Sequence, residues 1–102
     1  MPVRCRWKAT SLLRSSDHIQ WDGDAWEDYC EWQRINPAIA KKINTLIKDT
    51  RRDPFEGIGK PEPLRHDLAG LWSRRINGTD RLTYKVVNDI IAILACKGHY
   101  DA

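Results

Sequence analysis

The sequence has no hydrophobic run long enough to cross a membrane. Its longest apolar stretch, residues 90–96, is far shorter than the roughly 20 residues that a spanning helix needs. Near the amino end, Leu12 and Leu13 form the only apolar cluster, which is too short for the hydrophobic segment of a secretory signal. These absences argue against a membrane protein.

Cysteine is scarce, and its spacing suggests no shared site. Cys5, Cys30 and Cys96 are an odd number, lie far apart and include no C-x-x-C pair. Neither a zinc site nor a disulfide framework is therefore expected. Cys30 and Cys96 fall within apolar patterns, which predicts buried thiols. We expect a reducing, cytoplasmic setting, no metal and no cofactor.

The composition is that of one small globular domain. The chain has 102 residues, of which 41% are hydrophobic and 30% charged, and it contains five tryptophans that add large buried areas to a modest core. Residues 1–16 carry four cationic side chains and no acid until Asp17. We interpret residues 1–17 as a flexible basic extension and residues 18–102 as the single domain.

Positive charge is also concentrated in the second half of the chain. The net charge is +3, and Arg65, Arg74, Arg75 and Arg81 lie within a short stretch. Such a cluster suits contacts with the phosphates of a nucleic acid. Solvated faces of strands explain it equally well, so charge alone leaves both interpretations open.

Two helices are predicted in the first half. Residues 25–33 place Trp26, Tyr29 and Cys30 at helical spacing after a possible cap at Asp22 or Asp24. Asn36 and a proline at the first helical position begin a second helix. Its apolar face repeats at i, i+4, i+7 and i+8, namely at Ile39, Ile43, Leu46 and Ile47. A short strand over residues 18–21 precedes this helical hairpin.

A loop and three strands are predicted in the second half. Residues 53–63 contain three prolines and two glycines, which exclude a helix or a central strand. Strands are expected over residues 71–76, 81–87 and 90–97, with an Asn77-Gly78 hairpin signal between the first two. The fold class is therefore α+β, with an N-terminal strand and a two-helix hairpin packed on one face of an antiparallel sheet.

The alternation of the strand at 81–87 places a candidate site on the other face of the sheet. If Leu82, Tyr84 and Val86 point to the helices, Arg81 points away from them. The loop that bears Glu62 and the chain end that bears His99 and Tyr100 could reach the same face. One carboxylate, one guanidinium, one imidazole and one phenol would then converge.

Several segments, in their order and spacing, carry a resemblance to a known family. They are Trp26-Glu27-Asp28-Tyr29, Lys42-Ile43-Asn44, Leu46-Ile47-Lys48-Asp49-Thr50-Arg51-Arg52, Pro54-Phe55-Glu56-Gly57, Gly59-Lys60-Pro61-Glu62-Pro63-Leu64, Leu71-Trp72-Ser73-Arg74-Arg75-Ile76, Arg81-Leu82 and His99-Tyr100. Over about residues 19–100 the sequence resembles the YoeB/Txe toxins, a branch of the RelE-like messenger-RNA interferases with a microbial-RNase-like fold. The resemblance implies metal-independent cleavage of the messenger in the ribosomal acceptor site. It also implies an acidic antitoxin partner of the YefM/Axe type, and a homodimer or a toxin–antitoxin complex.

The resemblance also implies a role for each matched residue. Glu62 corresponds to the general base for the ribose 2′-hydroxyl, and Arg81 to the group that offsets charge on the phosphate. His99 corresponds to the acid for the leaving oxygen, which suits the ordinary histidine pKa of about 6.5. Tyr100 would orient the phosphate or stack on a base. Arg65, Arg74 and Arg75 are further candidates for contacts with the RNA backbone.

The sequence departs from the family pattern at its end. Gly98 replaces a common aromatic residue before His99, and Asp101 and Ala102 follow the usual terminal tyrosine. Lower activity is one expected consequence. Two alternatives to the ribonuclease thus remain: a translation inhibitor that binds the ribosome without cleavage, and a nucleic-acid-binding module that is not an enzyme.

Overall fold

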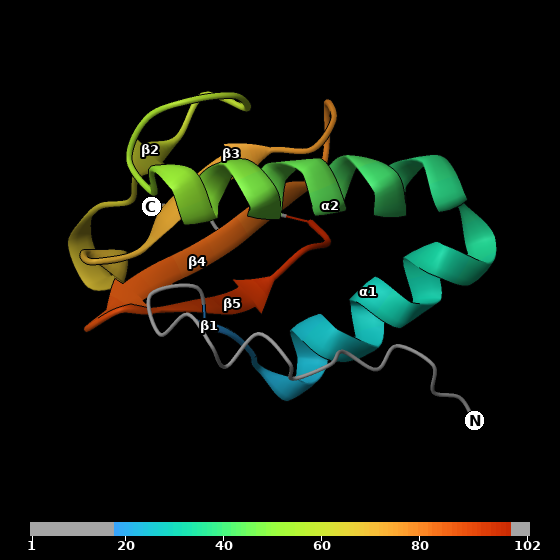
Figure 1. Ribbon diagram of the computed structural model, residues 1–102, viewed down its shortest axis with the longest axis horizontal. Coiled ribbons are helices and arrows are strands. Elements are labelled where there is room, and N and C mark those ends of the chain that lie inside the picture. The colour runs from blue at the N-terminus through green and yellow to red at the C-terminus, as the bar shows by residue number, and fades with distance from the viewer. Residues whose placement is uncertain (1–17, 99–102) are drawn as a thin grey trace.

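The computed structural model describes residues 18–98 and forms one α+β unit (Figure 1). The predicted extension over residues 1–17, His99 and Tyr100 lie outside the described residues. The elements in chain order are β1 (His18–Trp21), α1 (Gly23–Ile35), α2 (Pro37–Arg52), β2 (Glu62–Pro63), the 3-10 helix η3 (His66–Leu68), β3 (Trp72–Arg75), β4 (Arg81–Val87) and β5 (Ile90–Ala95). No helix of this part of the chain is long and apolar enough to cross a membrane.

The five strands form one sheet in the order β1-β5-β4-β3-β2. Strands β3 to β5 pair antiparallel, as predicted. The short β2, which falls in the predicted loop, adds antiparallel to β3, and β1 runs parallel to β5 and makes the sheet mixed. A parallel pair requires a long crossover, and here both helices and three strands separate β1 from β5 along the chain. The alternation in residues 18–21 indicates a strand but carries no information about its direction.

Both predicted helices are confirmed, and α1 is slightly longer than expected. Asp22 and Asn36 occupy the two N-cap positions, and a proline begins α2, but neither cap side chain bonds to the helix backbone. In Figure 1, α2 lies over β3 and β4. The lysines at positions 41, 42 and 48 are exposed, so the amphipathic pattern of α2 orients this helix as predicted.

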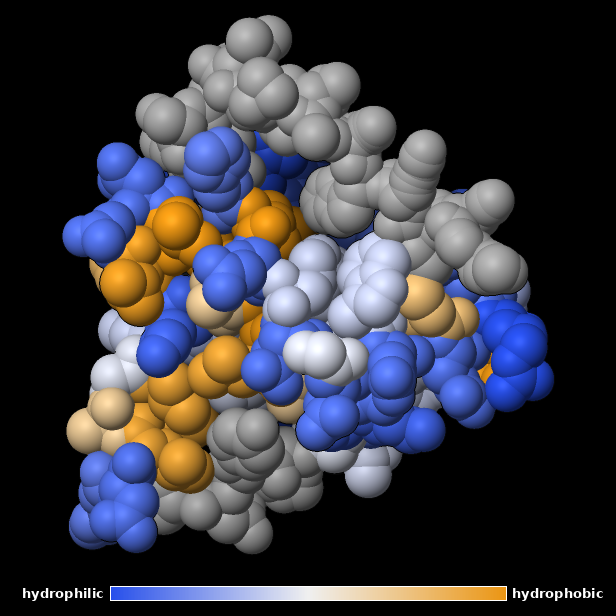
Figure 2. Space-filling view, turned by 90° about the horizontal axis from the view of Figure 1, so that it is seen from below, coloured by the Kyte–Doolittle hydropathy of each residue, from blue (hydrophilic) through white to orange (hydrophobic). Residues whose placement is uncertain are grey.

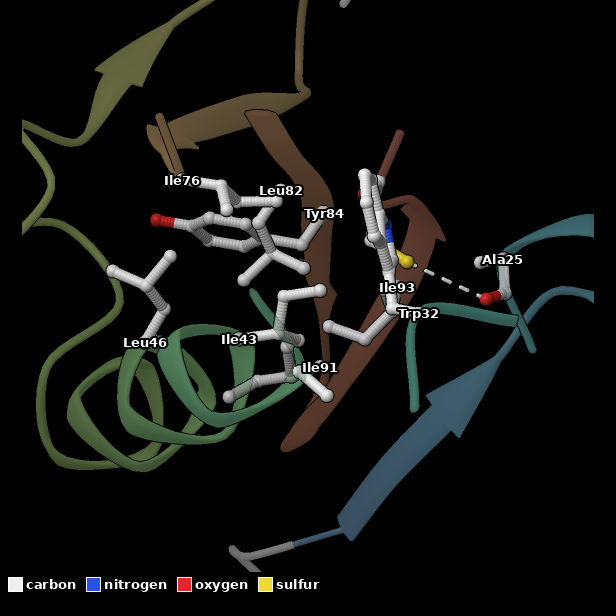
Figure 3. Close-up of a cluster of buried hydrophobic side chains, with 11 residues drawn as sticks. Ala25, Trp32, Ile43, Leu46, Ile76, Leu82, Tyr84, Ile91 and Ile93 are labelled. Carbon is white, nitrogen blue, oxygen red and sulfur yellow. Dashed lines mark hydrogen bonds between the residues drawn. The ribbon is translucent and has the colours of Figure 1, made fainter. Parts of the chain in front are cut away.

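The core lies between the helices and one face of the sheet (Figure 3). Ile43 and Leu46 of α2 are fully buried against Leu82 and Tyr84 of β4, together with Ile93 of β5. The predicted inward face of β4 is therefore confirmed. Side chains at alternate positions of β4, beginning with Arg81, lie on the opposite face, which we call the open face.

The thiols differ in burial. Cys96 is fully buried in the core and donates a hydrogen bond to the carbonyl of Ala25. Burial raises the pKa of the Cys96 thiol to about 12, so it remains protonated and unreactive. Cys30 is only partly buried, which makes the prediction of a buried thiol wrong at that position.

The outer surface is patchy in hydropathy. In Figure 2, apolar side chains gather at the left of the face shown, and hydrophilic side chains cover much of its right. Among the described residues, the large apolar side chains with substantial exposure are Ile35, Phe55, Ile58 and Val87. Scattered exposure of this kind is usual for a folded protein.

Candidate active site

Glu62 and Arg81 meet on the open face of the sheet. Glu62 lies in β2, a two-residue edge strand, where its backbone pairs with Ser73. Arg81 is the first residue of β4. Its Nη1 lies 3.8 Å from Oε1 of Glu62, and the two side chains are 31% and 54% exposed. The pair is loose and accessible, as a site that accepts a ligand requires.

The chain reaches its last described residue beside Arg81. The Arg81 amide donates a hydrogen bond of 2.8 Å to the carbonyl of Gly98, and the Gly98 amide donates one of 2.8 Å to Oδ1 of Asp80. Gly98 has a φ of +71°, a left-handed conformation that glycine adopts at little cost. The glycine that departs from the family pattern is thus held at both of its backbone polar groups.

Asp80 is a residue that the sequence-based interpretation missed. Besides the Gly98 amide, its carboxylate accepts a hydrogen bond of 3.1 Å from the side-chain Nδ2 of Asn77. The Asn77 side chain in turn accepts the amides of Thr79 and Asp80, which closes the turn between β3 and β4. The Asn-Gly pair therefore marks the hairpin as predicted, but through an asparagine side-chain turn. The sequence does contain a signal for this role, because Asp80 is an acidic residue at the end of a turn that begins with asparagine.

Two of the predicted RNA-binding arginines are exposed. Arg75 is directly opposite Arg81 in the β3–β4 ladder, and Arg65 lies just before η3. Both side chains can meet a polyanion without rearrangement. Arg75 and Arg81 lie side by side near Glu62, whereas Arg65 follows β2 beyond Leu71, at the other end of β3.

The third arginine, Arg74, lies inside the protein. It is fully buried, and all of its N–H donors are used: by Asp49 at 2.7 Å, by the Tyr84 hydroxyl, and by the carbonyls of residues 53, 56 and 58. The prediction that Arg74 contacts RNA is therefore corrected, since no donor remains for a phosphate. Arg74 pairs with Leu82 in the ladder and so faces the helices.

The Arg74 cluster fixes the loop that leads to Glu62. Asp49 of α2 also accepts the amide of Ile58, and the Tyr84 hydroxyl donates to the carbonyl of Pro54 at 2.6 Å. The hydrogen bond from Arg74 is the main cause that lowers the pKa of Asp49 from 3.8 to about 2. The loop is thereby bound to α2 and to the sheet through one buried cation.

Gly59 brings the same loop against the sheet. Its φ is +78°, and its carbonyl accepts the amide of Arg75 at 2.7 Å. A Cβ atom here would lie 2.8 Å from Cδ2 of Leu46, closer than packed carbon atoms approach. Only glycine fits here without displacing the Leu46 side chain. The loop therefore packs closely against α2 and the sheet just before β2 begins.

The described site is therefore a carboxylate and a guanidinium on a basic, accessible sheet face. A carboxylate can accept a proton, and a guanidinium can hold an oxyanion in the fork of its donors. Among residues 18–98 no group of three or more His, Cys, Asp and Glu side chains could hold a metal ion.

This fold and face define a class of small bacterial toxins. The YoeB/ParE toxin from Agrobacterium tumefaciens superposes with a TM-score of 0.79 at 42% identity, covering 81% of this chain and 99% of that one. The YoeB dimer from Staphylococcus aureus gives a TM-score of 0.76 at 45% identity, covering 81% and 97%.

Sequence comparison then gives the family. Residues 21–100 match the model for the YoeB-like toxin of bacterial type II toxin–antitoxin systems. Toxin YoeB of Escherichia coli K12 is 58% identical over 80 residues, which are 78% of this chain and 95% of the relative. Toxin YoeB of Streptomyces coelicolor is 49% identical over 82 residues, or 80% and 98%. The chain belongs to the YoeB-like toxins.

Proposed function

We propose that this toxin is a metal-independent endoribonuclease that cuts messenger RNA in the acceptor site of the ribosome. The observation that carries the proposal is the Glu62–Arg81 pair, an accessible carboxylate beside a guanidinium on a basic face. These groups suit a proton acceptor and a phosphate clamp. Membership of the YoeB-like family supports the same assignment.

In the proposed reaction, the Glu62 carboxylate takes the proton of the ribose 2′-hydroxyl. The 2′-oxygen then forms a bond to the adjacent phosphorus, and the bond from phosphorus to the 5′-oxygen breaks. Protonated His99 gives its proton to that leaving oxygen. The products are a 2′,3′-cyclic phosphate, which water can open to a 3′-phosphate, and a 5′-hydroxyl.

The remaining residues bind rather than transfer protons. Arg81 offsets the charge that builds on the phosphate in the transition state. Arg65 and Arg75, both exposed, contact neighbouring phosphates. Tyr100 orients the phosphate or stacks on a base. Inhibition of translation follows, because each cut removes a message from use.

The protein partner in this proposal is an acidic antitoxin of the YefM type. Solved relatives include a YoeB–YefM complex and a YoeB dimer, both from Staphylococcus aureus. An acidic chain complements the net charge of +3 and the arginines around Glu62. Binding over the open face would keep RNA away from the site.

The experiment adds purified protein to ribosomes that are translating one defined message, with free message as the control. We expect discrete cuts within the reading frame on ribosomes, and 2′,3′-cyclic phosphate ends on the fragments. An intact message with stalled translation would contradict cleavage and support an inhibitor that only binds. Unaffected translation despite tight RNA binding would support the non-enzymatic module.

A further inference from the structure

Two hydroxyl groups on the open face are buried and have no hydrogen-bond partner. Ser73 is 2% exposed and Thr83 is 1% exposed. Neither Ser73 Oγ nor Thr83 Oγ1 bonds to another protein atom, and Trp21 Nε1 is the third such atom in the described part of the chain. Buried polar side chains nearly always have a partner, so two neighbouring exceptions require an explanation.

The strand registers place both hydroxyls within the candidate site. Ser73 is the direct partner of Glu62 on one side and of Thr83 on the other. Thr83 lies two residues after Arg81 on β4, and so on the same face. The hydroxyl pair therefore forms the floor of the sheet face on which the ion pair between Glu62 and Arg81 lies.

The packing of the adjacent residues confirms that the hydroxyls point away from the core. Leu82 and Tyr84, on either side of Thr83, are fully buried among the helix side chains (Figure 3). Arg74, next to Ser73, bonds to the Tyr84 hydroxyl on that same side. Alternation then turns Ser73 and Thr83 toward the open face.

We propose that the Ser73 and Thr83 hydroxyls are substrate-binding donors that bond to the non-bridging oxygens of the scissile phosphodiester. This inference rests on the proposed function and extends its phosphate site from one residue to three. A hydroxyl bonded to an ionised phosphate forms a short, strong hydrogen bond. The loose ion pair allows Arg81 to move with the phosphate. Both hydroxyls are buried in the free protein, so binding of the phosphate requires them to become accessible.

A role in substrate binding and a purely structural role predict different effects of mutation on stability and on cleavage. In the free protein the hydroxyls are buried and have no hydrogen-bond partner. Replacing one with a methyl group of similar shape therefore removes the free-energy cost of burying an unpaired polar group. The substitution Thr83→Val is therefore expected to leave the thermal midpoint of unfolding unchanged or to raise it. The same substitution is expected to reduce the cleavage rate.

The experiment measures single-turnover cleavage on programmed ribosomes, at saturating and at low toxin concentrations, together with thermal unfolding. Thr83→Val and Ser73→Ala should each reduce cleavage about tenfold, the loss expected for one hydrogen bond to a charged group. Thr83→Ser keeps the hydroxyl and should recover most of the rate. A message with a 2′-deoxyribose at the cut keeps the phosphate but cannot react, and it should bind less tightly to Thr83→Val.

Thr50→Val is the matched control. Thr50 is also fully buried, but its hydroxyl donates a hydrogen bond of 2.7 Å to the carbonyl of Leu46 within α2. This variant should lose stability and keep the cleavage rate of the folded protein. Thr83→Val should therefore slow cleavage without loss of stability, whereas Thr50→Val should lose stability without slower cleavage.

The outcomes separate this inference from the proposed function. If the wild type leaves the message intact, both proposals are wrong. If the wild type cuts and Thr83→Val and Ser73→Ala cut equally fast, only the role of the hydroxyls is rejected. Equal binding of the deoxy message by wild type and Thr83→Val would also reject it, because the phosphate contact would then be absent.

Discussion

Arg74 of β3 and Asp49 of α2 form an ion pair of 2.7 Å in which the guanidinium is completely buried. The same guanidinium bonds to three carbonyls of the loop between α2 and β2. A buried cation that loses its anion is strongly destabilising, whereas a pair with full hydrogen bonding is tolerated. The loop that presents Glu62 thus depends on one interaction between helix and sheet.

Substituting Asp49→Asn should reveal that dependence. It keeps the size of the side chain but leaves Arg74 buried without a counter-charge. We expect the free energy of unfolding to fall by about 3 kcal/mol, measured by urea denaturation. The exposed Asp67→Asn in η3 is the control, and it should change stability little. Equal stability of both variants would contradict a structural role for the pair.

Acid should weaken the same interaction. The pKa of Asp49 is lowered in the folded protein to about 2, from an ordinary 3.8. The unfolded chain therefore takes up this proton first, and the stability that Asp49 contributes is present above pH 4 and is lost as pH falls toward 2. Denaturation of wild type and Asp49→Asn at a series of pH values checks this. Their difference in stability should shrink between pH 4 and pH 2, and a constant difference would contradict it.

The proposed proton transfers predict the effect of two further variants. Glu62→Gln and His99→Gln should fold normally, since Glu62 is more than half exposed, but cut messages at least about a hundredfold more slowly. Measurement is by cleavage on programmed ribosomes, with circular dichroism to check folding. If both variants arrest growth as well as wild type, Glu62 and His99 are not the acid–base pair.

The Asp80 carboxylate should matter for activity through the chain end that it holds. Asp80→Ala removes the acceptor of the Gly98 amide, one residue before His99, so we expect about tenfold slower cleavage from misplacement. Asp80→Asn keeps a side-chain oxygen and should retain more activity. The exposed Asp89→Ala, in the turn between β4 and β5, is the control. A pH–rate profile of unchanged shape would show that Asp80 positions the site without transferring protons.

Much of this fold could be predicted because helix and strand periods are local. The apolar repeat of α2 and the alternation of β4 gave the correct elements and the correct inward faces. The parallel pairing of β1 with β5 could not be predicted, since direction depends on the whole chain path. The bulge between β4 and β5, at Thr83 and Tyr84, also lacks a local signal.

For the site, the sequence identified Glu62 and Arg81, which the structure brings together. It grouped Arg74 with Arg75, although adjacent residues of a strand face opposite sides, so alternation alone argued against a shared role. The hydroxyls of Ser73 and Thr83 were not found. Serine and threonine are common in strands, and only burial without a partner distinguishes these two.

The position of β5 in the sheet has a consequence for synthesis. It is the last strand of the chain, yet it lies between β1 and β4, so β1 has no neighbouring strand until β5 has been made. A nascent chain therefore cannot complete its core until β5 has left the ribosome that makes it. Completion of this core therefore waits for residues 90–95 and depends on contacts between segments that lie far apart in the sequence.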